Sequence, residues 1–369
     1  MPLLPLAAAA RDAEHEVLFA TDRQYHPMLA EAGLTPVAAG STVREVMASL
    51  RAQAPAGQPF DASARAFGDV LARRMVADLA PVLADRRPDL MVYEVLTPGA
   101  GMAAMRAGVP AVCHGIGRLT GGPVWKAMSD TWLATAAEFG IGAPAHDAEF
   151  LGNRYLDVCP PSLQLPGFAP AREPIPMRPG TWRHAAPLPA TVRERDESRP
   201  LVYLTLGTAF GTPDLLRQAV TGLSRLPVDL LVTGGGRGGQ GGLGALPPNV
   251  TVEGWVPQGD LLPRVDLVVS HGGGSTVLEV LSNGLPHLML PQGADQFSNA
   301  RAVVEAGAGR QLLPGEVTPE ALAEQAEALL HDESARRSAG RLAGEIAAMP
   351  SPREALDRLL DTVVGPGGS

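Results

Sequence analysis

A run of glycines directly after an apolar segment carries the strongest chemical signal in the chain. Residues 265–270 read VDLVVS, which is typical of a buried strand, and His271 with three glycines follows as a turn. Ser275 and Thr276 then open a stretch with helical character. We therefore expect the first turn of a helix at a strand end, where free backbone N–H groups bind anions.

The same turn supplies the other parts of a phosphate site. Gly273 and Gly274 would let a phosphate approach the backbone closely, because glycine has no Cβ. The His271 ring would lie where it can donate a hydrogen bond to that phosphate. A strand-to-helix turn that needs glycine only for close packing explains these residues about equally well.

A Trp-Val-Pro-Gln sequence at the end of the segment 249–256 suggests a second contact surface. Trp255 offers a flat face for a nucleotide base, and Val256 offers extended backbone that can pair with a base edge. A core tryptophan before a helix that starts at proline is the simpler explanation, because tryptophan usually contributes to packing.

Two more strand ends carry polar or small residues. Asp295 and Gln296 stand at a strand-to-helix junction, where they suit sugar hydroxyls, although Asp295 is also a good helix N-cap. Gly207 and Thr208 follow the first strand of the second half and are placed for a phosphate contact, although they suit a turn as well.

Other chemistry is disfavoured. The spacing G-x-G-x-x-G occurs at Gly234, Gly236 and Gly239, but loop and strand follow it, where a dinucleotide site needs a helix. No Asp-X-Asp pair is present to hold a divalent cation on a diphosphate. The two cysteines, Cys113 and Cys159, lack the spacing of metal ligands. We expect no metal and no cofactor.

The elements that must position these residues alternate between strand and helix nearly throughout, which predicts parallel sheets covered by helices on both faces. In the first half we expect strands at 16–21, 34–39, 89–94 and 109–114, with helices at 65–85 and 98–107. In the second half we expect strands at 201–207, 228–234, 249–256, 265–270 and 287–291, with helices near 213–225 and 275–283.

At 369 residues the chain is too long for one ordinary core, so we predict two doubly wound, Rossmann-like α/β domains. The predicted parts are an N-terminal domain at 1–180, a linker at 181–199, a second domain at 200–350 and a terminal helix in 351–369. Ligands of such sheets bind outside the carboxyl ends of the strands, so we expect the ligands in a cleft between the two halves.

Charge and hydropathy exclude several partners. The net charge of −9 argues against a nucleic-acid or anionic membrane surface. No run of about 18 apolar residues is present, so no membrane span is expected. The few cysteines fit a reducing cytoplasm, and we expect a monomer or a homodimer there.

Taken together and in order, these motifs resemble the nucleotide-sugar signature of the UDP-glycosyltransferases, a family with plant, mammalian and bacterial members. The matching sequence comprises W-x-P-Q from Trp255, H-G-G-G-S-T from His271 with Glu279, Gly284-x-Pro286, Pro291 and the pair Asp295-Gln296. The likeness extends more loosely over the whole chain, which looks like an actinobacterial antibiotic or polyketide glycosyltransferase of the GT-B fold.

The resemblance implies that the second domain binds a UDP- or dTDP-sugar. The implied contacts are Trp255 and Val256 at the base, Gln258 and Glu279 at the ribose, Gly207, Thr208, His271, Gly273, Gly274, Ser275 and Thr276 at the diphosphate, and Asp295 and Gln296 at the sugar. The first domain would bind a small hydrophobic acceptor such as an aromatic polyketide, a macrolide or a flavonoid-like compound. Segments 41–63 and 115–150 are expected to shape its pocket, and the terminal helix is expected to cross back onto this domain.

The implied reaction is metal-independent, inverting transfer of the sugar to an acceptor hydroxyl, through an oxocarbenium-like state. The helix N-terminus and His271 would stabilise the departing diphosphate. Two alternatives stay open, a nucleotide-sugar epimerase of similar architecture and a catalytically impaired nucleotide-sugar-binding helper protein.

The resemblance also bears on the start of the chain. The opening MPLLPLAAAA is similar to the first helix of the family, which a strand and a Gly-His pair precede, so we expect a first strand and a catalytic histidine upstream of Met1. Glu94 ends the predicted strand 89–94, where the family has a catalytic aspartate. Glu94 would orient that histidine or act as a weaker base, unless it merely ends a strand.

Overall fold

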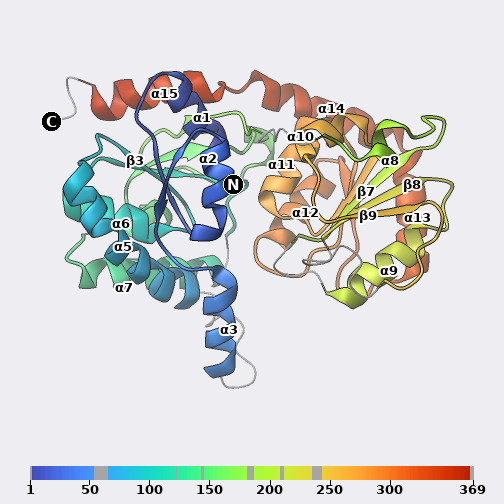
Figure 1. The fold of residues 1–369 in the computed structure, drawn as a ribbon, viewed down its shortest axis with the longest axis horizontal. Coiled ribbons are helices and arrows are strands. Elements are labelled where there is room, and N and C mark those ends of the chain that lie inside the picture. The colour runs from blue at the N-terminus through green and yellow to red at the C-terminus, as the bar shows by residue number, and fades with distance from the viewer. Residues whose placement is uncertain are drawn as a thin grey trace. The chain divides into compact units, whose positions relative to one another are not determined.

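The computed structural model describes residues 2–53, 65–121, 123–142, 145–180, 187–207, 212–234 and 243–365. The chain divides into two compact units. Unit 1 combines Met1–Cys159, Gln164–Arg178 and Met349–Ser369, and unit 2 combines Pro160–Leu163 with Pro179–Ala348. Both units are α/β structures whose strands pair in parallel, which confirms the predicted fold class (Figure 1).

The described strands of unit 2 form a six-stranded sheet in the order β12-β11-β10-β7-β8-β9. Its strands are β7 Leu201–Thr205, β8 Asp229–Thr233, β9 Val250–Glu253, β10 Leu267–Ser270, β11 His287–Met289 and β12 Gly309–Gln311. Its helices are α8 Ala190–Arg193, α9 Pro213–Leu223, α10 Gln258–Leu261, α11 Gly274–Ser282, α12 Gln296–Glu305, α13 Pro319–Leu330 and α14 Glu333–Ala348. The strand order reverses between β7 and β10, so the topological switch point of the sheet lies there.

The central strand of unit 2, β7, is buried on both faces. Its successive side chains point to opposite sides of the sheet, and each side is covered by a core. Val202 and Leu204 join the core beneath α9 and α13, which lie side by side (Figure 1). Leu201 and Tyr203 join a second core on the other face, together with Val280 of α11. An uninterrupted apolar run in the sequence therefore becomes the middle of the sheet.

The described part of the predicted linker, residues 187–199, is built into unit 2. Leu188 and Val192 are buried in the same core as Leu201, and α8 forms around Val192. Leu188 lies before α8 and Val192 within it, so the segment and its short helix together cover this face of the sheet. Residues 181–186 lie outside the described residues.

Unit 1 contains two parallel sheets, β1-β2 and β3-β4-β5-β6. The strands are β1 Leu18–Thr21, β2 Thr35–Ala38, β3 Met91–Glu94, β4 Ala111–His114, β5 Arg154–Asp157 and β6 Ile175–Pro176. The helices are α1 Leu4–Asp12, α2 His26–Glu31, α3 Val43–Gln53, α5 Leu71–Arg86, α6 Pro98–Ala107, α7 Pro123–Glu138 and α15 Pro352–Leu359. The expectation of a further strand before Met1 stays a prediction.

Helix α15 belongs to unit 1, where it packs against α1 and β6. Ala355, Leu356 and Leu359 form its buried face. A reciprocal cap starts the helix, because Ser351 Oγ accepts from the Glu354 N–H and the Glu354 carboxylate accepts from the Ser351 N–H.

Unit 1 contains the segments expected to shape the acceptor pocket and both cysteines. The segments expected to shape an acceptor pocket, 41–63 and 115–150, contain α3 and α7, while residues 54–64 lie outside the described part. Cys113 and Cys159 are buried, and they form no disulfide. Within the described ranges, no helix combines the length and the apolar character that a membrane crossing requires.

Candidate functional site

The predicted phosphate-binding residues lie at the switch point of the unit 2 sheet. Ser270 ends β10 and pairs in register with Thr205, which ends β7. His271 follows β10 directly, and Gly207 follows β7 after one residue, Leu206. Ligands of doubly wound sheets bind at this position, because the connections from the two central strands leave toward opposite faces.

The His271 ring lies against two glycines that the sequence analysis singled out. A Cβ atom on Gly207 would be 2.8 Å from His271 Cε1, and a Cβ atom on Gly273 would be 2.6 Å from His271 Nε2. Only glycine fits at either position while the ring stays in place. Gly207 also has a φ of +66°, which residues with a side chain rarely adopt.

His271 is mostly buried, and its Nδ1 atom has no hydrogen-bond partner. Burial lowers the pKa of His271, whereas the Thr205 carbonyl and the Asp295 carboxylate act in the opposite direction. Lowering the pKa favours the neutral imidazole, which keeps one donor and one acceptor nitrogen.

Helix α11 begins one residue earlier than expected, at Gly274, and Asp295 holds its first turn. Asp295 Oδ2 accepts from the Gly274 N–H at 3.1 Å. The side chain of Asp295 therefore caps the neighbouring helix, whereas the sequence suggested a cap on its own helix, α12. In the described structure, the N–H groups of Ser275 and Thr276 have no partner, so this end of α11 keeps free donors.

Three buried polar residues beside this turn were not identified from the sequence. Ser270 Oγ accepts from the Gly272 N–H at 3.0 Å and lies 2.7 Å from His287 Nε2. Asn299 Nδ2 donates to the Gly272 carbonyl at 3.0 Å. Asn299 follows Asp295 by one helical turn, which is the only sequence signal that links these groups.

Gln296, predicted at the sugar, is almost completely buried, with 2% of its surface exposed. Its Oε1 atom accepts from the N–H groups of Gln292 and Gly293 at 2.8 and 3.1 Å. The side chain thus shapes the loop that precedes α12, and its Nε2 atom is the group left to bind a ligand.

Gln258 and Glu279, both predicted at the ribose, lie near one buried tyrosine. Gln258 Nε2 donates to the Tyr203 hydroxyl at 2.9 Å, and that hydroxyl lies 2.8 Å from Thr233 Oγ1. The charge of Glu279 raises the pKa of Tyr203 further, after desolvation as the main cause. The structure therefore brings the two predicted residues together on the face of the sheet that α11 covers.

Glu279 itself is an unusual carboxylate. Burial raises its pKa to about 7, and its buried Oε2 atom has no hydrogen-bond partner. A carboxyl group with this pKa exchanges its proton near neutral pH, so it can donate or accept a hydrogen bond.

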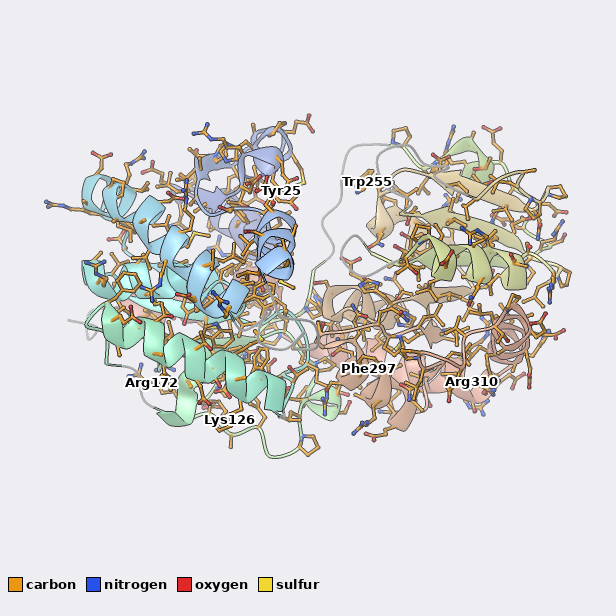
Figure 2. The ribbon with its side chains drawn as sticks, turned by 90° about the horizontal axis from the view of Figure 1, so that it is seen from below. Tyr25, Lys126, Arg172, Trp255, Phe297 and Arg310 are labelled. Atoms are coloured by element: carbon orange, nitrogen blue, oxygen red, sulfur yellow. The ribbon has the colours of Figure 1, made fainter. Side chains whose placement is uncertain are left out.

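Trp255 lies on the surface of unit 2, whereas Val256 lies in its core. Trp255 is 57% exposed, whereas Val256 is 3% exposed and belongs to the core that contains Tyr203. Among the described residues of unit 2, Phe297, next to Gln296, is a second large aromatic side chain that is exposed (Figure 2). The exposure of Trp255 excludes the simpler explanation of a core tryptophan, and an exposed ring can stack on a ligand.

Glu94, the predicted catalytic residue, lies in unit 1 at the carboxyl end of β3. It pairs in register with His114 of β4, so both side chains leave the sheet on the same side. Glu94 is half-buried, and its Oε1 atom lies 3.4 Å from the Leu96 N–H. His114 is fully buried, and desolvation lowers its pKa to about 4.

Some predicted features cannot be placed. Thr208 and the glycines Gly236 and Gly239 of the rejected dinucleotide motif lie outside the described residues. Within the described ranges, no cluster of three or more His, Cys, Asp or Glu side chains is arranged to hold a metal ion.

Comparison with protein families places both halves of the chain in one group. Residues 8–207 match the N-terminal domain of erythromycin biosynthesis protein CIII-like proteins, and residues 223–362 match their C-terminal domain. L-demethylnoviosyl transferase from Streptomyces niveus is 33% identical over an alignment that covers 95% of this chain and 92% of the relative.

Solved structures show the same similarity. The glycosyltransferase SsfS6 from Streptomyces sp. SF2575, complexed with thymidine diphosphate, is 27% identical, with a TM-score of 0.79 and coverage of 98% of this chain and 96% of that chain. Spinosyn rhamnosyltransferase SpnG complexed with spinosyn aglycone is 26% identical, with a TM-score of 0.79 and the same coverage.

Proposed function

The chain belongs to the erythromycin biosynthesis protein CIII-like glycosyltransferases, and from that premise we propose that it transfers a sugar from a dTDP-sugar to a hydroxyl group of a small hydrophobic natural product. The thymidine diphosphate bound by SsfS6 supports the choice of nucleotide, and the aglycone bound by SpnG supports the class of acceptor. The observation that carries the proposal for this chain is the His271 ring between Gly207 and Gly273 at the switch point of unit 2.

The diphosphate would bind at the start of α11. The free N–H groups of Ser275 and Thr276 and the positive end of the helix dipole favour an anion there. The His271 ring supplies one more donor from the same side. These groups lie where charge develops as the bond from the anomeric carbon to the diphosphate breaks, so they stabilise the transition state more than the ground state.

The nucleoside would lie between surface and core residues of unit 2. Trp255 offers an exposed ring to stack on the base, and the backbone at Val256 would face the base edge. Gln258 and Glu279 would bind ribose hydroxyls, and the unpartnered Oε2 atom of Glu279 supports this role. Asp295 and Gln296 would hold the sugar with the atoms that the protein's own hydrogen bonds leave available.

In the proposed reaction the acceptor oxygen attacks the anomeric carbon from the face opposite the diphosphate. The carbon–diphosphate bond breaks, the configuration inverts, and the acceptor proton passes to a base. We assign Glu94 to that base or to its orientation. A helix N-terminus and an imidazole stabilise the leaving group without a divalent cation, so we propose that transfer is independent of metal.

The test is to incubate the purified protein with dTDP-glucose or UDP-glucose and a panel of phenolic and macrolide acceptors, with and without EDTA. Mass spectrometry would detect a glycoside, and the proton coupling at the anomeric carbon would give its configuration. We expect a glycoside of inverted configuration from dTDP-glucose in the presence of EDTA.

The alternatives predict other results. An epimerised donor without any glycoside would favour the epimerase, and donor binding without any product would favour a helper protein.

The substitution His271→Ala should lower turnover about 100- to 1,000-fold, because one hydrogen-bond donor to the developing charge is lost. Unchanged turnover and unchanged dTDP affinity would remove His271 from the site.

A further inference from the structure

The turn between β10 and α11 is fixed by side chains on both sides of one peptide unit. The Gly272 N–H donates to Ser270 Oγ at 3.0 Å, and the Gly272 carbonyl accepts from Asn299 Nδ2 at 3.0 Å. Gly272 has a φ of +81°, and a Cβ on it would meet the backbone carbonyl of Gln296 at 3.4 Å. This residue is thus held in a conformation that the local sequence alone does not impose.

Asn299 joins this turn to the carboxylate that caps α11. Its Nδ2 atom also donates to Asp295 Oδ2 at 2.7 Å, and the same oxygen accepts from the Gly274 N–H at 3.1 Å. Both hydrogens of the amide are therefore used, one on Gly272 and one on Asp295. A side-chain amide is suited to this position, because it offers two donors from one nitrogen.

Ser270 is anchored from a third element. Its hydroxyl shares a hydrogen bond of 2.7 Å with Nε2 of His287 in β11, and both side chains have 0% of their surface exposed. Burial lowers the pKa of His287 to about 3, so the imidazole stays neutral and the pair carries no charge near pH 7. A polar chain thus runs from β11 through β10 to the turn.

We propose that Ser270, His287 and Asn299 are positioning residues, which hold Gly272 and Asp295 so that the His271 ring and the first N–H groups of α11 face the diphosphate of the donor. They act through the turn and do not touch the donor. The proposal rests on the proposed function of this site, and it adds residues that the nucleotide-sugar signature of the sequence did not identify.

Two observations tie these residues to ligand binding rather than to stability alone. They converge on the three-residue turn at the switch point, where the ligand of such a sheet binds. In addition, Asn299 holds the Asp295 carboxylate, which accepts from the Gly274 N–H, while in the described structure the N–H groups of Ser275 and Thr276 stay free for an anion. A network that served only stability would gain by capping the remaining donors as well.

The test compares Asn299→Ala with a matched control on the same sheet. Asn249 is a partly buried asparagine whose Nδ2 donates to the carbonyls of Ser224 and Val228 at 3.1 and 3.0 Å. It precedes β9, at the amino ends of the strands, away from the switch point. Asn249→Ala therefore removes similar hydrogen bonds and affects stability without touching the site.

The affinity for dTDP would be measured by titration calorimetry with the full chain, so no acceptor or turnover is needed. We expect Asn299→Ala to weaken dTDP binding about tenfold or more, since hydrogen bonds to charged groups are lost around the site. Asn249→Ala should leave the affinity unchanged. In turnover assays Asn299→Ala should raise KM for the donor and lower kcat, because His271 is also displaced.

Hydrogen exchange provides a structural readout. In Asn299→Ala the amides of residues 272–277 should exchange faster, whereas Asn249→Ala should leave them unchanged. If Asn299→Ala does not fold, Ser270→Ala is a smaller change that tests the same proposal. Ser270→Thr keeps the hydroxyl, so it should bind dTDP more tightly than Ser270→Ala.

The outcomes separate this proposal from the function itself. If the unaltered protein does not bind dTDP, the proposed function fails. If it binds dTDP, and Asn299→Ala and Ser270→Ala bind with the same affinity as Asn249→Ala, the function stands and the positioning role is wrong.

Discussion

Histidines at strand ends illustrate how one residue type acquires different roles from its surroundings. His114 and His287 are completely buried, and desolvation lowers their pKa values to about 4 and about 3. His271 is only partly buried and lies beside two glycines, and the Thr205 carbonyl and the Asp295 carboxylate oppose the lowering of its pKa. Only the third combines a ring nitrogen without a partner and a position at the switch point of the sheet.

The lowered pKa of His114 predicts a pH-dependent contribution to stability. Between pH 4 and 6.5 the unfolded chain binds a proton at this histidine and the folded chain does not, so its contribution to stability falls as the pH falls. Relative to His114→Gln, the free energy of unfolding should drop by about 3 kcal/mol from pH 7 to pH 4. Urea denaturation of both proteins over this range measures the difference, and parallel curves would contradict a buried neutral histidine.

A substitution at Gly273 tests the packing of the His271 ring. Gly273→Ala would place a Cβ 2.6 Å from His271 Nε2, although its φ of −65° suits alanine. The ring must move, so turnover should fall about 10- to 100-fold while the melting temperature changes little.

The control for that change is a glycine in open space. Gly344 lies within α14, and a Cβ on it would have no neighbour within 4 Å. Gly344→Ala should leave turnover unchanged and stabilise the protein by about 0.5–1 kcal/mol. Equal turnover in both variants would show that the ring does not depend on Gly273.

At the scale of elements, the capping box of α15 can be tested alone. Ser351→Ala removes the acceptor for the Glu354 N–H and should cost about 1 kcal/mol of stability. Ser351→Thr keeps a hydroxyl and should cost much less, so thermal unfolding of the two variants separates the cap from side-chain size. A similar loss in both would mean that the cap contributes nothing.

The sequence predicted strands and helices where an apolar run is bounded by turn residues. The expected strand 265–270 contains β10, and the expected helix 98–107 is α6, because apolar runs and turn glycines are local signals. The polar contacts were not accessible in this way. Asn299, Ser270 and His287 stand on three elements, and only the tertiary structure brings them to one peptide unit.

The role of Asp295 shows the same limit. Its sequence position suggests a cap for the helix that follows it, but its carboxylate caps α11, which precedes it by about twenty residues. The sequence could predict that Asp295 caps the N-terminus of a helix. It could not predict which helix, because that depends on how β10 and β11 pair.

At the scale of the whole molecule, the two units should respond differently to ligand and to truncation. A ligand stabilises the unit that binds it, so dTDP should raise the unfolding temperature of unit 2 and leave that of unit 1 unchanged. Removing residues 349–369 deletes α15, whose buried face includes Leu356 and Leu359, and should lower the stability of unit 1.

Scanning calorimetry of the full and truncated chains, with and without dTDP, measures both effects. The control is the transition of unit 2 in the truncated chain, which should still rise on addition of dTDP. Loss of that rise would mean that the two units do not melt independently.

The assembly of unit 1 from three separated segments has a consequence for biosynthesis. Unit 2 is nearly continuous in sequence, whereas unit 1 is completed by α15, which is translated only after all of unit 2. On the ribosome, unit 2 can therefore finish folding first, although unit 1 begins to emerge earlier, which reverses the usual N-terminal-first order. Until α15 emerges, the surface of α1 that it covers stays exposed on the nascent chain, so unit 1 can complete its core only after synthesis has passed the end of unit 2.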